Sequence, residues 1–428
     1  MTNKFLSRVL KHPVTQNALS LFTVQIARYI LPLITIPYLA RVLGPEAWGL
    51  VIFAQASSQW LLIVLEYGFR LSATREIARN RDNQEKVAEI VASVIGAFGL
   101  LLLGSGLVVL VMGLTVPTFK QNPNYLIWAW LVAIAGGMSP LWYFQGIERM
   151  QLPAMMDLAA RTLASIGTFI WIKTPDDGWK VLALQAIAGF FASGLMIVWM
   201  YRKIPGKLPR LTSAFAALRM GWSMFLFQSS ASLYTTANTF ILGLLAPAAQ
   251  VGFYGGAERI SKTVLNLLTP ISQAMFPRMS YLMANDSKRA TKLASISMVV
   301  MGLGGLVLAG VLAIAAPLIV NILLGAKFAA AVPLLRILVL LIPLIALSNV
   351  LGIQWMIPLG LDRAFNLIII SAGFINLILA VILTQRFGST GMAWVVVFSE
   401  AFVTVAIYFV LWRKGLGLHQ VKNIGITK

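Results

Sequence analysis

The sequence predicts an all-α integral membrane protein, and its composition gives the first reason. Of 428 residues, 59% are hydrophobic and 11% are charged, and the mean hydropathy is +0.83. Soluble domains carry about 25% charged residues, so this balance excludes a soluble fold. Apolar windows of roughly 20 residues, long enough to cross a bilayer as a helix, recur about twelve times.

The chain is expected to form two six-helix halves, residues 1–210 and 211–428. The similar segments GPEAWGLVIFAQ in the first half and APAAQVGFYGGAE in the second indicate an internal repeat. Because both halves start on the same side, the repeat favours a pseudo-two-fold axis along the membrane normal. The predicted spans lie at approximately 17–40, 47–69, 88–112, 124–147, 157–173, 179–200, 219–245, 251–276, 293–319, 331–356, 365–384 and 391–412.

Basic residues are distributed unevenly between the predicted loops. By the predicted topology, roughly 24 of the 34 Lys and Arg residues lie on one side of the membrane and about six on the other. This positive-inside pattern predicts that both termini are cytoplasmic, and it explains the net charge of +20 without nucleic acid as a partner. The chain has no cysteine, which excludes disulfides and thiolate metal sites.

The first predicted span has a polar face. Gln25, Arg28 and Tyr29 share this face because they recur at three- and four-residue spacing. A cation inside an apolar span costs on the order of 3 kcal/mol on insertion scales, so it normally faces protein or water. Arg28 lies about three turns inside the helix start, which favours a cavity as its location. Extension of its long side chain to the membrane interface is the alternative.

The eighth predicted span carries three charged residues, Glu258, Arg259 and Lys262. Glu258 and Lys262 are four residues apart, in the favourable order for an ion pair on a helix. Such a pair fixes helix packing in one interpretation and contributes to a binding site in the other. Arg259 lies roughly 100° away around the helix, so it requires another partner or an anionic ligand. The stripe that starts at Glu258 and Lys262 continues through Asn266, Thr269 and Gln273.

Hydroxyl and amide side chains form one face of the seventh predicted span. Such a face makes interhelical hydrogen bonds, worth about 0.6 kcal/mol each, or it lines a hydrated lumen. The length of the face favours the lumen. Its members are Gln228, Ser232, Thr235, Thr236 and Thr239.

Three carboxylates are predicted well inside the membrane, Glu66, Glu258 and Glu400. Glu66 has Arg70 and Glu258 has Lys262 at i+4, whereas Glu400 has no basic neighbour on its own helix. Desolvation is expected to favour protonated Glu400, which makes it the candidate for proton coupling, with a structural hydrogen bond as the alternative. The chain lacks the G-x-x-x-x-G-K-[ST] loop that holds ATP, so no cofactor is expected beyond a coupling ion, proton or sodium.

The position of Arg336 and the distribution of histidine and acidic residues limit the kinds of site that the sequence can form. Arg336 lies about five residues into its predicted span, so we interpret it as extending to the interface, with ligand contact as the alternative. Enzyme chemistry lacks support, because His12 and His419 lie in the two tails. No predicted span carries two acidic residues three or four apart, which argues against metal sites and paired-carboxylate catalysis.

Five segments, distributed over both halves, have characteristic sequence motifs. They are PYLARVLGPEAWG, YGFRLSATREIARNR, PLWYFQGIERM, VGFYGGAERISKTVLNLLTPISQAMFPRMS and FAAAVPLLRIL. In this order they resemble signatures of the bacterial polysaccharide flippases, the Wzx-type O-antigen translocases. That family belongs to a superfamily with multidrug and peptidoglycan-precursor exporters. The resemblance implies a transporter of the inner membrane that moves a lipid-linked oligosaccharide, with membrane lipid and polysaccharide-assembly proteins as partners.

The resemblance also implies roles for the intramembrane cations. An undecaprenyl-diphosphate-linked sugar has an anionic head, a polar glycan and an apolar tail. Arg28, Arg259 and Lys262 are expected to hold the diphosphate while the two halves open alternately to each side. The further substrate-binding candidates are Gln25, Tyr29, Gln228 and Asn266.

Two alternatives remain at this point. A multidrug or cation exporter of the same superfamily would favour intramembrane carboxylates, whereas the predicted centre here is basic. A membrane enzyme of polysaccharide assembly, a polymerase or ligase, would carry a large outer loop with catalytic residues. The predicted outer loops are short, such as 246–250, and this makes the enzyme the weaker alternative.

Overall fold

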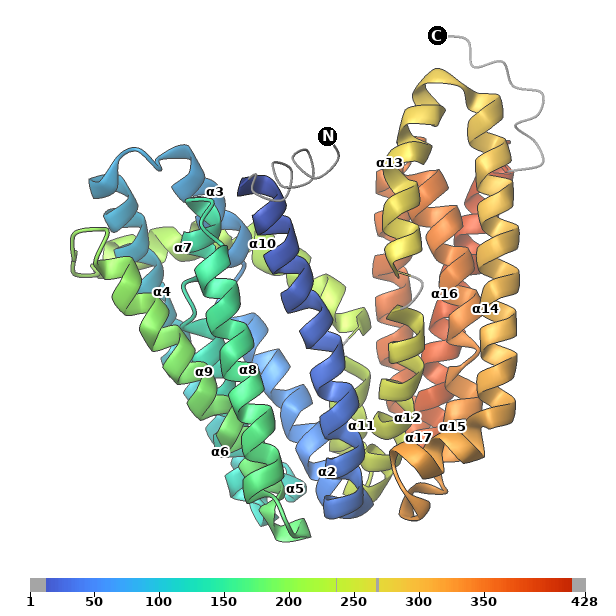
Figure 1. The fold of residues 1–428 in the computed structure, drawn as a ribbon, viewed down its shortest axis with the longest axis horizontal. Helices are drawn as coiled ribbons and strands as arrows, with labels where there is room; N and C mark the ends of the chain where they lie inside the picture. Colours follow the sequence, from blue (N-terminus) through green and yellow to red (C-terminus); the bar gives the residue numbers. More distant parts are fainter. Residues whose placement is uncertain (1–12, 236, 267–268, 418–428) are drawn as a thin grey trace, which may run out of the picture. The chain divides into compact units, whose positions relative to one another are not determined.

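The computed structural model describes residues 13–235, 237–266 and 269–417, and all regular structure in these ranges is helical (Figure 1). Side chains are described for these residues except 13–30, 32, 227, 230–235, 269–271, 273 and 274. The all-α fold class predicted from the sequence is therefore confirmed.

Contacts divide the chain into two compact units, Met1–Ser229 and Ser230–Lys428. The boundary lies within helix α10 (Leu211–Thr235), whereas the sequence suggested a division before this helix, after residue 210. The difference arises because Ala214 and Ala217 of α10 are buried in the apolar core of the N-terminal unit. The six-helix content of each half stays a prediction.

Helix ends in the N-terminal unit follow local sequence signals. Asn83 caps α4, because its side chain accepts a hydrogen bond from the Lys86 backbone N–H at 3.0 Å. Pro117 and Pro123 begin α5 and α6, where the missing N–H is tolerated. The helices are α2 (Pro13–Glu66), α3 (Phe69–Arg79), α4 (Gln84–Thr115), α5 (Pro117–Gln121), α6 (Pro123–Gly137), α7 (Leu141–Gly146), α8 (Gln151–Trp171), η1 (Pro175–Asp177), α9 (Gly178–Tyr201) and most of α10.

The C-terminal unit contains shorter, interrupted helices beside two long ones. The π-helical segment η3 interrupts the path from α16, and such segments often occur at functional sites. The elements are α11 (Ala237–Leu245), α12 (Ala248–Asn266), α13 (Thr269–Asn285), α14 (Ser287–Leu323), η2 (Ala326–Phe328), α15 (Ala331–Leu338), α16 (Leu341–Ser348), η3 (Asn349–Met356) and α17 (Asp362–Arg413).

Two long helices, α2 and α17, each contain a sharp turn at a glycine. Gly44 has φ 71° and Gly388 has φ 57°, values that side chains with a Cβ rarely adopt. At the second turn the Ser389 backbone N–H donates to the Gln250 side chain at 2.9 Å. Each turn lies between two predicted spans, so each of these helices holds two of the segments expected from the sequence.

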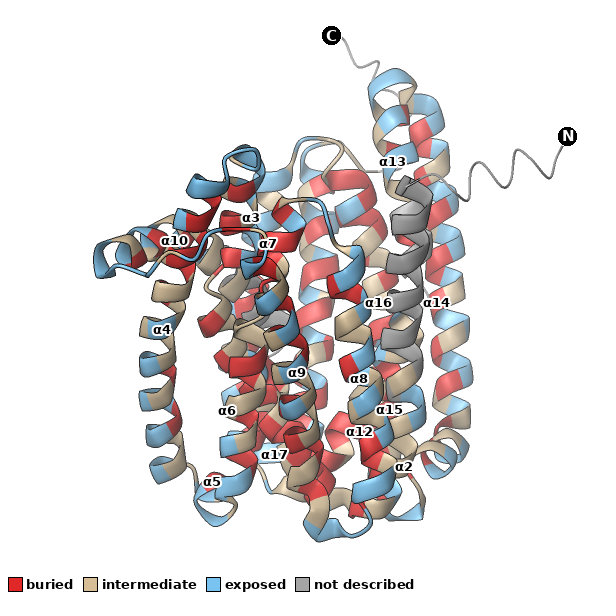
Figure 2. Ribbon diagram, turned by 60° about the vertical axis from the view of Figure 1, so that its left-hand side comes forward, coloured by how far each residue is buried: buried red, intermediate tan, exposed pale blue. Residues whose placement is uncertain are grey.

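Seven helical stretches in the described part of the chain are long and apolar enough to cross a membrane. The most apolar windows of α4 and α14 are only 22% buried. Figure 2 shows exposed residues along the length of α4, and these include Leu103 and Leu107, which are 74% and 64% exposed. Such continuous apolar exposure indicates a lipid-facing surface.

Candidate functional site

The charged cluster on α12 is the most concentrated set of predicted site residues that the structure describes. The Lys262 ammonium lies 2.9 Å from the Glu258 carboxylate, so the expected i, i+4 pair forms. The Thr239 hydroxyl of α11 donates to the other carboxylate oxygen of Glu258 at 3.1 Å. Glu258 therefore has a partner for each oxygen, one of them on a neighbouring helix.

Small residues of α12 pack this helix closely against its neighbours. Gly256 packs so closely that a Cβ there would lie 2.7 Å from the Leu324 side chain. The buried Ser261 hydroxyl donates to the backbone carbonyl of Leu338, at the end of α15, at 3.1 Å. These contacts pack α12 inside the unit, while the Lys262 side chain is 55% exposed.

The net charge of this cluster is positive. Glu258 is formally negative, and Arg259 and Lys262 are formally positive, so the formal charges of these three residues sum to plus one. Arg259 is half-buried, and Asn266, at the end of α12, is exposed. The side chains of Thr269 and Gln273, which continue the predicted stripe, lie outside the described residues.

The polar face predicted on the seventh span is described only in part. Gln228 is half-buried in α10, and Thr239 on α11 contacts the α12 cluster through Glu258. Ser232, Thr235 and Thr236 lie outside the residues whose side chains are described. One member of this face is thus in contact with the charged cluster, an arrangement that sequence spacing alone does not reveal.

The candidates on the first span cannot be placed at side-chain level. Gln25, Arg28 and Tyr29 belong to α2, but their side chains lie outside the described ones. Further along the same helix, the Thr35 hydroxyl donates to the backbone carbonyl of Leu31 at 3.0 Å. The roles of these three candidates stay predictions.

Glu66 and Arg70 interact electrostatically, but among the described residues no direct ion pair joins them. Glu66 is the last residue of α2, and Arg70 lies on α3. Between them Tyr67 and Gly68 adopt left-handed conformations with φ 42° and φ 72°. The i, i+4 relation applies to one continuous helix, and this turn breaks it.

Glu400 on α17 is buried, with 6% of its surface exposed. The Ser348 hydroxyl, at the end of α16, donates to a carboxylate oxygen of Glu400 at 2.7 Å. Thr404 donates to the Glu400 backbone carbonyl at 2.9 Å and also contacts the Leu344 carbonyl at 3.3 Å. Ser348 directly precedes the π-helical segment, so the carboxyl group is linked to the irregular part of this unit.

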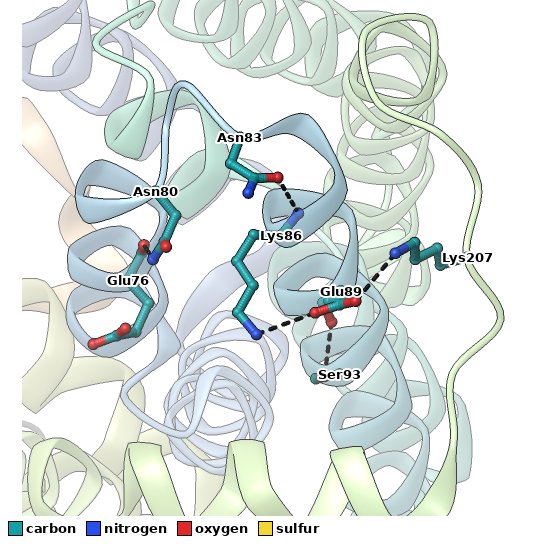
Figure 3. Close-up of polar contacts among 7 residues, drawn as sticks. All are labelled: Glu76, Asn80, Asn83, Lys86, Glu89, Ser93 and Lys207. Carbon is teal, nitrogen blue, oxygen red and sulfur yellow. Dashed lines mark hydrogen bonds and ion pairs between the residues drawn. The ribbon is translucent and has the colours of Figure 1, made fainter.

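A second polar cluster, absent from the sequence-based candidates, lies in the N-terminal unit. Glu89 of α4 accepts hydrogen bonds from Lys86 and Lys207, both at 3.1 Å (Figure 3). Lys207 belongs to the loop after α9, so this contact ties the loop to α4. The Ser93 hydroxyl donates to the Glu89 backbone carbonyl at 2.7 Å. The Glu89 side chain is 50% exposed, which indicates a surface contact.

Among the described residues, no group of three or more His, Asp or Glu side chains is placed to hold a metal ion.

Comparison with known proteins identifies the family. The sequence profile described as "Polysaccharide biosynthesis protein" matches residues 14–283, which is more than half of the chain. The chain belongs to this family. A relative from Escherichia coli (strain K12) is 32% identical over 400 residues, covering 92% of this chain and 95% of the relative. A relative from Shigella dysenteriae is 29% identical over 401 residues, covering 91% and 98%. Both carry the name "Putative O-antigen transporter".

Two solved structures of transporters are also similar to this chain. The lipid II flippase MurJ in an inward closed conformation aligns with a TM-score of 0.64 at 15% identity, covering 91% of this chain and 87% of that chain. An outward-facing multidrug resistance MATE transporter of the MOP superfamily gives 0.51 at 15% identity, covering 94% of both chains. These likenesses confirm the predicted transporter fold, and the protein is a multi-pass membrane protein. The relatives are named as transporters, which confirms the prediction that the chain is not an enzyme.

Proposed function

We propose that this protein moves a lipid-linked oligosaccharide from the cytoplasmic to the periplasmic leaflet of a bacterial inner membrane, with undecaprenyl diphosphate as the lipid carrier. Its family membership and the names of its two relatives support this cargo class. The proposed mechanism is alternating access, in which the protein opens to one side of the membrane at a time.

The presence of two basic side chains, Arg259 and Lys262, on α12 is the observation that carries the proposal. Diphosphate is a strong anion, and a guanidinium or ammonium group in a low-dielectric environment attracts it more strongly than in water. Glu258 holds Lys262 at 2.9 Å, but the Lys262 side chain is 55% exposed and retains other N–H donors. In this proposal Arg259 and Lys262 bind the diphosphate.

Replacement of Arg259 tests the proposed anion site. Arg259→Ala should abolish export of surface polysaccharide in a host that lacks its own transporter, and Arg259→Lys should retain part of it, because charge remains while bidentate geometry is lost. Arg413→Ala is the matched control, since Arg413 is an exposed arginine in the last turn of α17. Normal export by Arg259→Ala at equal protein level would exclude cargo binding by this residue.

A multidrug exporter is the alternative function, and the same variants separate the two. A cation exporter would gain activity from removal of a positive charge in its path, so the dye resistance that it confers would change in Arg259→Ala. Cells that express Arg259→Ala should therefore show unchanged resistance to cationic dyes if the protein moves an anionic lipid. Strong dye resistance from the unmodified protein, lost or altered in the variant, would favour the exporter.

Glu400 is the proposed site of proton coupling. Glu400 is a buried carboxyl group that accepts a hydrogen bond from Ser348 of another helix, and this position inside the unit supports the proposal. Glu400→Gln keeps an oxygen that accepts from Ser348 but cannot ionise. It should give a folded protein that fails to export. Export at the normal rate, with the usual response to a collapsed proton gradient, would contradict this role and make sodium coupling through other residues the better proposal.

The location of both termini in the cytoplasm is also part of the proposal. Reporter fusions after Leu211 and Lys428 should be cytoplasmic, and fusions near Gln121 and Gly388 should be periplasmic, because the positive-inside pattern assigns them so. A reporter that gives the same side for Gln121 and Leu211 would contradict the twelve-span topology.

A further inference from the structure

Helix α14 contains a proline that interrupts its backbone hydrogen bonds. Pro317 lies inside Ser287–Leu323 and has no N–H group, so it cannot donate to the carbonyl of Ala313, four residues earlier. In water a solvent molecule would replace the missing donor. Within a membrane the replacement must come from protein, because an unsatisfied carbonyl in hydrocarbon costs several kcal/mol.

Arg336 supplies a donor at this carbonyl. Its side-chain Nε lies 3.2 Å from the Ala313 oxygen, and this is a contact between α15 and α14. The backbone from which Arg336 extends is well fixed, because Leu334, Leu335 and Leu338 are all buried. The direction of the guanidinium is therefore set by the packing of α15.

We propose that Arg336 is a positioning residue whose guanidinium replaces the backbone donor that Pro317 removes from α14. This role differs from both interpretations suggested by the sequence, extension to the membrane interface and contact with a ligand. An arginine suits it because Nε–H is rigid with respect to the planar group and never loses its proton.

The rest of α14 shows why this end of the helix requires such a contact. Further back along the helix, α14 and α16 pack backbone to backbone, since a Cβ at Gly305 would lie 3.0 Å from Pro343 Cα. A Cβ at Gly302 would lie 3.2 Å from the Leu347 side chain. These close contacts fix α14 before the proline. The Arg336 contact provides a donor for the carbonyl whose backbone partner the proline removes.

A double-mutant cycle tests the proposal without reference to transport. Arg336→Met removes the donor but keeps a long apolar side chain, and should lower the thermal midpoint of the purified protein in detergent by roughly 2 to 4 °C. Pro317→Ala restores the backbone N–H, so the midpoint of the Arg336→Met/Pro317→Ala protein should return to within about 1 °C of Pro317→Ala alone. Pro277→Ala is the control, because Pro277 lies inside α13 of the same unit and should not rescue Arg336→Met.

Export provides the second readout and separates this inference from the proposed function. If Arg336 only positions backbone, Pro317→Ala should restore export to Arg336→Met cells although the cation is gone. A ligand-binding arginine could not be replaced in this way. Additive losses in the stability cycle, or equal rescue by Pro277→Ala, would overturn the inference whatever the cargo is. Restored stability without restored export would also overturn it, in favour of a direct contact of Arg336 with an anion.

Discussion

Glu89 in the N-terminal unit and Glu258 in the C-terminal unit make similar contacts in different surroundings. Each carboxylate accepts from two side chains, Glu89 from Lys86 and Lys207, and Glu258 from Lys262 and Thr239. The Glu89 side chain is 50% exposed, whereas that of Glu258 is 16% exposed. The same carboxylate chemistry is therefore placed once at a surface and once in the interior.

The difference in exposure changes how much each carboxylate contributes to stability. At the surface, solvent screens the ion pair and the lost side-chain entropy offsets most of its gain. In the interior, removal of one partner leaves the other charge poorly solvated, so the pair is costly to break. We infer that close packing stabilises the N-terminal unit more than its surface ion pairs do. In the C-terminal unit, polar contacts between helices contribute to stability.

The largest loss of stability is expected from a substitution of Gly68, which lies in a closely packed part of the N-terminal unit. It has φ 72°, and a Cβ on it would lie 2.7 Å from the Phe225 backbone nitrogen of α10. Gly68→Ala should therefore destabilise the N-terminal unit by about 3 kcal/mol, through the strained backbone and the overpacked contact together. Thermal or chemical unfolding in detergent measures it.

Gly104 is the matched control for this change. It lies on α4, and a Cβ there would meet no atom within 4 Å. Gly104→Ala should cause no loss of stability, because alanine favours the helix over glycine. If Gly68→Ala were as stable as Gly104→Ala, the idea that close packing holds this unit would be wrong.

Glu258→Leu is the second prediction and tests the interior pair. It leaves the Lys262 ammonium and the Thr239 hydroxyl without their carboxylate partner. We expect a loss of about 2 kcal/mol, below the ~3–5 kcal/mol of a fully buried pair, because Lys262 is 55% exposed. Lys262→Met in the same chain should recover much of the loss, since it removes the unpaired charge. A loss that the second substitution deepens would show that the two residues act independently.

The sequence predicted the fold more completely than the site. Helical segments occupy the predicted spans in the described residues, because apolar runs of bilayer length leave no other structure that satisfies the backbone. Gly44 and Gly388, where the two long helices turn sharply, lie in the gaps between consecutive predicted spans. The pair of Glu258 with Lys262 was also predictable, because it lies within one helix.

Contacts between helices were not predictable from one sequence. Ser348 stands in an apolar run, and nothing in its spacing indicates that it donates to Glu400, 52 residues later. The contact of Arg336 with Ala313 depends on how two helices pack, although Pro317 marks where a donor is needed. Glu66 and Arg70 lie on two different helices, because two residues with positive φ, Tyr67 and Gly68, separate α2 from α3.

The smallest effect on stability is expected for a substitution of Glu89, whose contact with the loop residue Lys207 can be tested directly. The loop that carries Lys207 also packs through Pro209, since a Cβ on Gly96 would lie 3.0 Å from the Pro209 side chain. Glu89→Gln keeps the shape of the side chain and removes only its charge. Because both lysine contacts are solvent-exposed, the thermal midpoint should not change measurably, at low or high salt.

Tryptic cleavage after Lys207 measures whether the loop leaves α4. Glu89→Gln should change the cleavage rate less than about twofold, since a screened ion pair contributes little to holding the loop. Gly96→Val should accelerate cleavage strongly, because it overfills the contact with Pro209 and displaces the loop. If Glu89→Gln released the loop as readily as Gly96→Val, the exposed ion pair would be as important as the interior one. Exposure would then not determine how much these carboxylate contacts contribute.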